Sequence, residues 1–283
     1  MPVREGVLPG KDASIHYLDW GGGGPPLVLI HATGFLAALW RPIAERLSSR
    51  FRVVAYDQRG HGDTPAPKGP GGYHFEAYAA DLQRLIEALQ LERPLVAGHS
   101  SGGTTAVVHA ATYPGVTSRA VLIEPILPRP EWSDLPPGGR SANTLAEGAR
   151  KRRAVWPSAE ELYQAYRTRE TFQSWREDVL RIYVEEGTRA RDDGQVELKC
   201  APEAEGAFFA SAMLMDFWPL VARVQCPALV LWGAESHLRD RLADHTQETL
   251  PNARTVVVPG TTHFLPQERP DEIARLMEEF LWD

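Results

Sequence analysis

A serine between two glycines is the residue of this chain most suited to nucleophilic chemistry. It is Ser100, in the stretch Gly98-His-Ser-Ser-Gly102, which matches the pattern G-x-S-x-G. The apolar residues 95–97 predict a buried strand, and the small residues 101–113 predict a helix that Pro114 ends. Small neighbours permit a sharp turn between strand and helix, and the helix N-terminus directs N–H groups toward the reacting atoms. We therefore predict that Ser100 is a nucleophile, rather than an incidental serine of a glycine-rich turn.

A serine hydroxyl needs a base to take its proton, and an imidazole held by a carboxylate is suited to that task. The chain has nine histidines. Four of them lie in loops, inside a predicted helix or directly before the serine: His31, His61, His99 and His109. His263 follows the last predicted strand, 253–258, and so lies at the carboxyl edge of the sheet. We predict that His263 is the base, the alternative being a histidine of an ordinary surface loop.

Attack on a carbonyl also needs two N–H donors for the negative oxygen that develops. The apolar run 26–30 predicts a strand buried on both faces, followed by the loop His31-Ala-Thr-Gly-Phe35. Loops at this end of a strand bind ligands in open α/β sheets. We predict that the backbone N–H of Ser101 is one donor and that of Thr33, or of its neighbour Gly34, is the other. The alternative is a simple connecting loop.

The turn Asp57-Gln-Arg-Gly-His-Gly-Asp-Thr64 contains side chains of the types found in catalytic and metal sites. Its two glycines predict a tight turn, which Asp57, Arg59 and His61 can brace through local hydrogen bonds. We expect a structural role for these residues, and the sequence predicts no metal site.

The length, composition and charge of the chain indicate the class of protein to which these residues belong. The chain has 283 residues, of which 43% are hydrophobic and 24% charged, as expected of a soluble globular protein with a large core. A net charge of −7 argues against a nucleic-acid partner. Cys200 and Cys226 form no metal or redox motif. The N-terminus lacks the pattern of a secretory signal, and no run is long and apolar enough to span a bilayer, so we expect a cytoplasmic protein without membrane contact.

The order of elements predicts one α/β core with an insertion. Strands are predicted within 3–19 and over 26–30, 51–56, 119–124 and 226–232, with helices over 36–47, 75–89 and 270–281. Between the strands 119–124 and 226–232 the alternation of strands and helices stops, and only helices are predicted, over 143–154, 158–167, 171–186 and 203–215. We predict a core over 1–127 and 219–283, with a helical cap over 128–218 above the site.

One basic run, Arg150-Lys-Arg-Arg153, lies in the predicted cap. We expect it to be a solvated helix face, and the alternative is recruitment of an anionic substrate.

Together these motifs resemble the α/β-hydrolase superfamily. The resemblance rests on Gly98-His-Ser-Ser-Gly102, the loop 31–35, Asp57-x-Arg-Gly-His-Gly62 and Pro259-Gly-x-x-His263-Phe-Leu-Pro-Gln-Glu268, and it covers residues 14–125 and 224–283. It implies a mostly parallel eight-stranded sheet with helices on both faces, an inserted helical cap, no cofactor, and a triad of serine, acid and histidine.

The acid of that triad is where the chain departs from the pattern. The family usually has an aspartate soon after the strand that ends here at Gly233, but Ser236 and His237 occupy those positions and Glu235 lies one residue early. Relatives similar to haloalkane dehalogenases have the acid at the end of the strand after the nucleophile's helix, where this chain has Glu124. A glutamate there is costly to bury without a partner such as His263. We favour Glu124 as the acid and keep Glu235 as the alternative.

A serine nucleophile favours attack on a carbonyl, whereas the dehalogenases and epoxide hydrolases of this superfamily use a carboxylate. The resemblance therefore implies a hydrolase of small or medium carboxylic esters with an acyl-enzyme intermediate. The same triad also serves C–C bond hydrolases, lactonases and perhydrolases, and a non-catalytic receptor for a small ligand is a further alternative. We predict a substrate pocket lined by apolar and aromatic side chains: Phe35, His99, Trp132, Trp156, Phe209, Met213 and Trp218.

Overall fold

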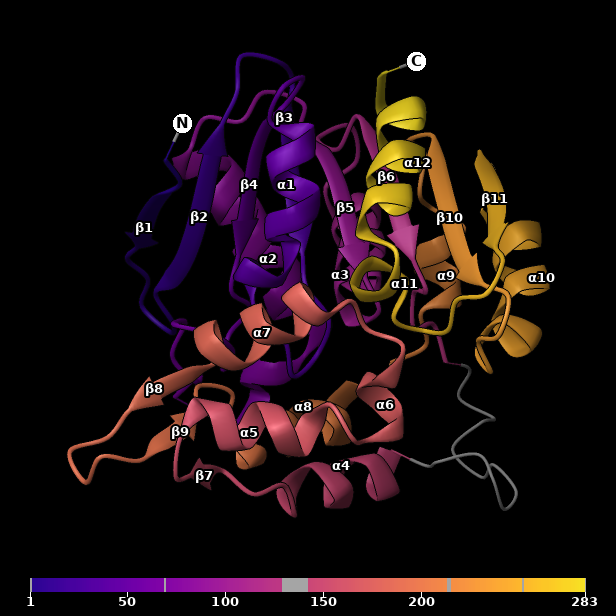
Figure 1. Ribbon diagram of the computed structural model, residues 1–283. Helices are drawn as coiled ribbons and strands as arrows, with labels where there is room; N and C mark the ends of the chain where they lie inside the picture. The colour runs from indigo at the N-terminus through magenta and orange to yellow at the C-terminus, as the bar shows by residue number, and fades with distance from the viewer. Residues whose placement is uncertain (1, 69, 129–141, 213–214, 251, 283) are drawn as a thin grey trace.

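An eight-stranded sheet forms the centre of the computed structural model (Figure 1), which describes residues 2–68, 70–128, 142–212, 215–250 and 252–282. The strands lie in the order β1 (Arg4–Leu8), β2 (Ile15–Gly21), β4 (Arg52–Tyr56), β3 (Pro26–Ile30), β5 (Leu95–His99), β6 (Arg119–Ile123), β10 (Ala228–Gly233) and β11 (Ala253–Val258). Only β2 runs antiparallel to its neighbours on both sides, so seven of these strands share one direction. The predicted mostly parallel α/β sheet is confirmed.

Both faces of the sheet are covered by helices because its central strands are apolar on both sides. On one face, Leu95 and Ala97 pack in a core with α1 (Arg41–Leu47) and α12 (Pro270–Trp282). On the other face, Val96 packs in a core with α2 (Phe75–Ala88), α3 (Ser101–Thr112), α9 (Trp218–Val221) and α10 (Arg239–Thr249). Short helices over Ala37–Trp40, Pro70–Tyr73 and α11 (Leu265–Glu268) complete the connections.

The elements from α4 to α8, which lie between β6 and β10 in the chain, form the layer below the sheet in Figure 1. Residues 128–218 are called the inserted segment from here on. Its elements are α4 (Ala142–Arg150), β7 (Val155–Trp156), α5 (Ala159–Tyr166), α6 (Glu170–Gln173), α7 (Glu177–Glu186), β8 (Thr188–Ala190), β9 (Val196–Leu198) and α8 (Pro202–Ala212), and its last residue begins α9. Apolar side chains of α5 and α7 share a core with Phe35 and Leu36, which follow β3. The inserted segment therefore packs against the loop that the sequence assigned to the oxyanion.

Two expectations for the inserted segment were wrong. The helix predicted over 171–186 is broken between α6 and α7, since the Ser174 hydroxyl donates to Glu268 (2.6 Å) and the Arg176 N–H to the Gln267 carbonyl (3.0 Å). The chain leaves the helical path there to bond to the core. The segment also contains an antiparallel sheet, in the order β7-β9-β8, that was not predicted. Asp193-Gly194, with φ +81° at the glycine, is the hairpin signal that could have indicated it.

Every helix in the described part of the chain is too short or too polar to cross a lipid bilayer.

Candidate active site

Ser100 lies at the turn between β5 and α3 in a strained backbone conformation, φ 55° and ψ −119°. A side chain on either flanking glycine would collide with backbone, because a Cβ on Gly98 would lie 2.2 Å from the Gly102 carbonyl oxygen and one on Gly102 would lie 2.3 Å from that of Ile30. The pattern G-x-S-x-G is therefore a steric requirement of the turn. The turn presents Ser100 at the carboxyl end of β5, where it is 8% exposed.

The structure brings Ser100, His263 and Glu124 together, although they come from three separate elements. His263 Nε2 lies 3.1 Å from Ser100 Oγ, and His263 Nδ1 lies 3.1 Å from Glu124 Oε2. This order leaves Nε2 free to accept the serine proton while Nδ1–H donates to the carboxylate. The geometry is thus that of a nucleophile, a base and an orienting acid in hydrogen-bond contact.

Glu124 is fully buried at the end of β6 and is held by two donors besides His263. The Gly233 N–H donates to Oε1 (2.7 Å), and the Ser236 hydroxyl donates to Oε2 (2.6 Å). Glu124 also has a positive φ of 51°, which a non-glycine residue adopts only where its surroundings enforce it. Glu235, the alternative acid, is exposed, and its backbone N–H bonds to the Thr261 carbonyl (2.9 Å). The end of β10 and the loop after it therefore supply donors to the carboxylate that follows β6.

His99 lies against His263 and bonds to its backbone. Its Nε2–H donates to the His263 carbonyl (2.8 Å), and the two rings lie 5.1 Å apart. Burial and the neighbouring His263 hold the pKa of His99 well below 6.5, so the ring stays neutral. His99 therefore holds the backbone at His263 without adding charge to the site.

The loop after β3 meets the start of α3 directly. The Thr33 hydroxyl donates to the Ser101 hydroxyl (2.9 Å), so the two residues predicted as oxyanion donors are neighbours beside Ser100. His31 stays neutral behind this loop, because burial, with the nearby His61, lowers its pKa to about 4. Its Nδ1–H donates to the Ala32 carbonyl (2.7 Å), and its Nε2 accepts from the Gln58 N–H (2.9 Å).

The residues predicted to line a pocket have different surroundings where the structure describes them. Phe35 lies close to the site, with its ring centroid 6.2 Å from that of His99. Three others make ring contacts with other side chains: Trp156 with Tyr166, Phe209 with Phe208, and Trp218 with His245. Trp132 and Met213 lie outside the described residues. A substrate pocket that includes these five aromatic or apolar residues stays a prediction.

Glu268 is a buried residue at the site whose position the sequence motif indicated but whose contacts it did not. Its carboxylate accepts from the Thr262 N–H (2.8 Å), the Thr262 hydroxyl (2.6 Å) and the Ser174 hydroxyl (2.6 Å). Thr262 directly precedes His263, and Ser174 belongs to the inserted segment. One carboxylate therefore connects the loop that contains His263 to the inserted segment.

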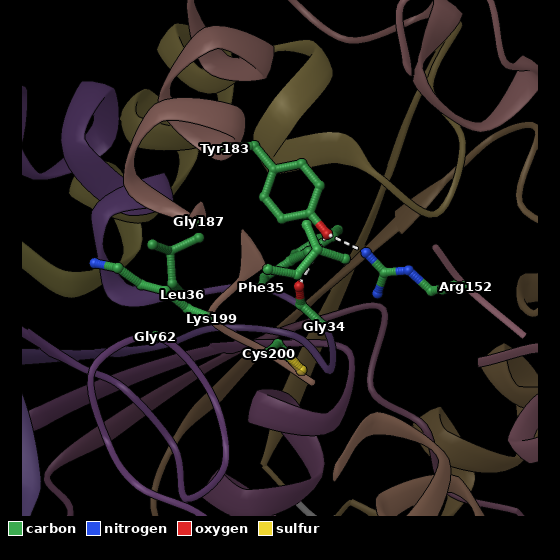
Figure 2. A pocket seen from close by; sticks show the side chains of 10 residues that line it. Gly34, Phe35, Leu36, Gly62, Arg152, Tyr183, Gly187, Lys199 and Cys200 are labelled. Carbon is green, nitrogen blue, oxygen red and sulfur yellow. Dashed lines mark hydrogen bonds between the residues drawn. The ribbon is translucent and has the colours of Figure 1, made fainter. Parts of the chain in front are cut away.

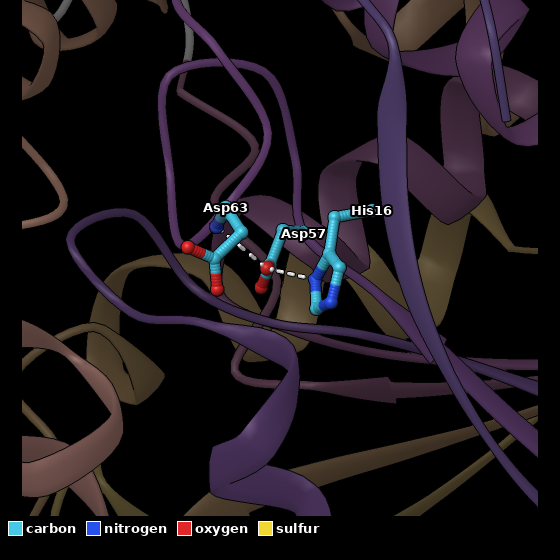
Figure 3. Close-up of side chains that lie close together, drawn as sticks. All are labelled: His16, Asp57 and Asp63. Carbon is cyan, nitrogen blue, oxygen red and sulfur yellow. Dashed lines mark hydrogen bonds and ion pairs between the residues drawn. The ribbon is translucent and has the colours of Figure 1, made fainter. Parts of the chain in front are cut away.

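Among the described residues, one group has the composition of a metal site: His16, Asp57 and Asp63 (Figure 3). Its polar atoms are already in use, because Asp57 Oδ2 accepts from His16 Nδ1 (2.6 Å) and the Asp63 N–H (2.9 Å), and Oδ1 accepts from the Ala37 N–H (2.6 Å). Although burial lowers the pKa of His16, the hydrogen bond and charge of Asp57 raise it above 6.5 overall, which favours an imidazolium rather than a metal ligand. Asp57 therefore braces the turn after β4 against β2 and the helix at Ala37.

The buried pair of His16 and Asp57 makes stability depend on pH. Because the folded-state pKa of His16 is raised, its stabilising effect is complete below 6.5 and is lost as pH rises through the folded-state value. We expect His16→Gln to lower the free energy of unfolding by about 3 kcal/mol at pH 6, and by less at pH 9. Urea unfolding at both values measures this. His74→Gln, at an exposed position, is the control, and an equal loss at both pH values would contradict the ion pair.

Comparisons with known proteins agree with this fold. A family model described as "Alpha/beta hydrolase family" matches residues 27–276. The 2-(acetamidomethylene)succinate hydrolase of Mesorhizobium japonicum is 30% identical over 263 residues, which cover 92% of this chain and 89% of that protein. The fluoroacetate dehalogenase of a Burkholderia species is 27% identical over 291 residues, covering 93% and 89%.

A solved structure extends the similarity to the whole chain. The crystal structure of an E-2-(acetamidomethylene)succinate hydrolase superposes with a TM-score of 0.85 at 24% identity and covers 100% of both chains. At that identity the likeness concerns the fold.

Proposed function

Because this chain belongs to the α/β-hydrolase family, we propose that it is a serine hydrolase of small or medium carboxylic esters. The observation that carries the proposal is the continuous hydrogen-bonded series Ser100–His263–Glu124, with 3.1 Å at each step between side chains. Family membership makes hydrolysis the general reaction, and the serine determines which bond is attacked.

In the first half of the proposed reaction, Ser100 Oγ attacks the ester carbonyl carbon while its proton passes to His263 Nε2. The electron pair of the carbonyl moves to its oxygen, which the N–H groups of Thr33 or Gly34 and of Ser101 stabilise. Glu124 stabilises the imidazolium that forms. The intermediate then breaks its bond to the alcohol oxygen, which takes the proton from Nε2 and leaves an acyl group on Ser100.

In the second half, water attacks the acyl carbon and gives one proton to His263 Nε2. The second intermediate breaks its bond to Ser100 Oγ, which recovers the proton from Nε2, and the carboxylic acid leaves. The site returns to its starting state, and the products are one alcohol and one acid for each ester and water consumed.

The hydroxyl at position 100 favours a carbonyl over a saturated carbon as the target. Displacement of a halide needs a carboxylate nucleophile that forms an alkyl ester. Ser100 cannot form one, so we do not carry the activity of the 27% identical dehalogenase over to this chain.

We further propose that the inserted segment is a cap that closes over the substrate, with the core over 1–127 and 219–283. The support is its packing against Phe35 and Leu36 and the hydrogen bond of Ser174 to Glu268. Both contacts lie beside the loops that hold the proposed oxyanion donors and the base.

A second candidate substrate is suggested by the relative that is 30% identical over 92% of the chain. Its name specifies 2-(acetamidomethylene)succinate, in which an acetamido group carries an amide carbonyl. The same serine could attack such a carbonyl, with an amine in place of the alcohol as leaving group. C–C bond hydrolysis, lactone hydrolysis and perhydrolysis use the same triad and remain alternatives.

A substrate panel tests the proposal. We expect p-nitrophenyl esters of two to eight acyl carbons to be hydrolysed with kcat/KM at least 100-fold above those of lactones, thioesters and 2-(acetamidomethylene)succinate. Faster turnover of the succinate by a similar factor would move the assignment to amide hydrolysis. If no substrate is turned over and a fluorophosphonate does not label the protein, the chain is not a serine hydrolase. That result would favour the alternative of a non-catalytic receptor for a small ligand.

A further inference from the structure

A largely buried arginine side chain of the inserted segment, that of Arg152, lies near the proposed oxyanion loop. The sequence predicted a solvated helix face for the run 150–153, and this is wrong for Arg152. Its guanidinium pairs with Glu205 of α8, and Nη2 also donates to Tyr166 Oη (3.1 Å) and Tyr183 Oη (3.3 Å). The side chains of Arg152 and Glu205 are only 19% and 11% exposed. Because the guanidinium has one carboxylate and two hydroxyl partners, Arg152 belongs to a hydrogen-bonded cluster and is not a solvated surface charge.

This cluster touches Gly34, one of the proposed oxyanion donors. Gly34 has φ +79°, and a Cβ placed on it would lie 2.9 Å from Glu205 Oε1 and 3.6 Å from Arg152 Nη1. A carboxylate this close to Gly34 would repel an oxyanion that forms at the N–H of this residue, unless a cation neutralised the carboxylate. Arg152 is that cation. The residue also needs to be glycine, both for its φ and for the close approach of Glu205.

Tyr183 connects the cluster to the backbone of the loop (Figure 2). Its hydroxyl donates to the Gly34 carbonyl (3.0 Å) and accepts from Arg152. Burial raises the pKa of Tyr183, so the hydroxyl keeps the proton that it donates. On the other side of the same peptide, the Phe35 N–H donates to the Ala32 carbonyl (3.1 Å). The peptide between Gly34 and Phe35 is therefore fixed at both ends, one of them from the inserted segment.

We propose that Arg152, Glu205 and Tyr183 form a charge-balanced clamp on the oxyanion loop, with Arg152 as a positioning residue of the hydrolytic reaction. Arg152 cancels the charge of Glu205 next to the developing oxyanion and orients the Tyr183 hydroxyl toward Gly34. The clamp acts on the transition state, in which the oxygen is charged, more than on the neutral substrate. This inference rests on the proposed function.

The test is a double-mutant cycle on hydrolysis of p-nitrophenyl butyrate. We expect Arg152→Met to lower kcat about 30-fold with KM changed less than threefold, because it leaves the Glu205 carboxylate unpaired beside the loop. Glu205→Gln removes the repelling charge and should lower kcat by less than threefold. The double variant should recover at least tenfold of the loss, since neither charge remains. Arg153→Met, at the exposed neighbour, is the matched control and should resemble the wild type.

A transition-state analogue separates this role from general support of the fold. A trifluoromethyl ketone adds to Ser100 to give an adduct with an oxyanion, and its Ki should rise in Arg152→Met by the factor that kcat/KM falls. Thermal unfolding checks that each variant folds. If Glu205→Gln is as damaging as Arg152→Met and the double variant recovers nothing, the cluster is merely structural and the clamp is wrong. If the wild type itself hydrolyses no ester, the proposed function fails instead.

Discussion

Ser100→Ala is expected to lower kcat for ester hydrolysis by about 10⁵-fold, because it removes the atom that forms the acyl-enzyme. The residual rate would come from the oxyanion donors and from substrate binding alone. The fold should be retained, since alanine is smaller and the turn is shaped by the flanking glycines rather than by the hydroxyl. Kinetics with p-nitrophenyl butyrate and circular dichroism of the same sample measure both properties.

Labelling gives an independent measurement of the same residue. A fluorophosphonate should attach to the wild type at Ser100, as peptide mass spectrometry can locate, and should not attach to Ser100→Ala. Ser49→Ala is the control, because it removes an exposed serine hydroxyl that donates to the Arg46 carbonyl, and it should be labelled like the wild type. Activity within tenfold of the wild type in Ser100→Ala would refute the proposed nucleophile.

Glu124→Gln is expected to have the second-largest effect, a loss of about 10³- to 10⁴-fold in kcat with KM little changed. The amide is nearly the same size as the carboxylate, but it cannot stabilise the imidazolium of His263. The Glu124 carboxylate accepts hydrogen bonds from Gly233, Ser236 and His263. The NH₂ group of glutamine cannot accept a hydrogen bond, so at least one of these donors would lose its partner. Steady-state kinetics across pH 5–9 measure the loss.

Glu235→Gln is the comparison that decides between the two acids. Since Glu235 is exposed and its backbone is what bonds to Thr261, we expect kcat within twofold of the wild type. The opposite ranking of the two variants would make Glu235 the acid, reached through a rearrangement of the loop after β10. Equal small losses in both variants would show that His263 needs neither carboxylate.

The strands could be predicted from local pattern, and the mostly parallel sheet from the resemblance to a known family, whereas the order of the strands comes from the structure. Continuous apolar runs such as 26–30 and 95–97 form strands buried on both faces, and the glycines around Ser100 fit only a turn with little space. The geometry now found around Ser100 and His263 follows from both lying at carboxyl ends of parallel strands. The strands and the turn depend on residues close to one another in the chain, and the common edge of the sheet then brings the two distant residues together.

Most of the contacts that the sequence did not show join distant segments. Arg152 looked like one residue of a solvated basic run, because nothing near it in the chain indicates Glu205 or Tyr183. The break at Ser174 depends on Glu268, which lies 94 residues away. Ser236, at the usual position of the acid, turned out to donate to Glu124. Tertiary partners override the helical pattern in such places, and only coordinates reveal them.

The members of the proposed triad are separated by unequal lengths of chain. Ser100 and Glu124 are 24 residues apart and directly follow the adjacent strands β5 and β6, which α3 joins, whereas His263 lies 139 residues beyond Glu124. Short-range contacts form early in folding, and long-range ones form late. A refolding chain should therefore assemble nucleophile and acid first and gain its base only when β11 docks at the sheet edge. The recovery of hydrolytic activity should then coincide with the end of folding. In a partly folded chain, Ser100 would already lie in its turn but would have no imidazole to take its proton.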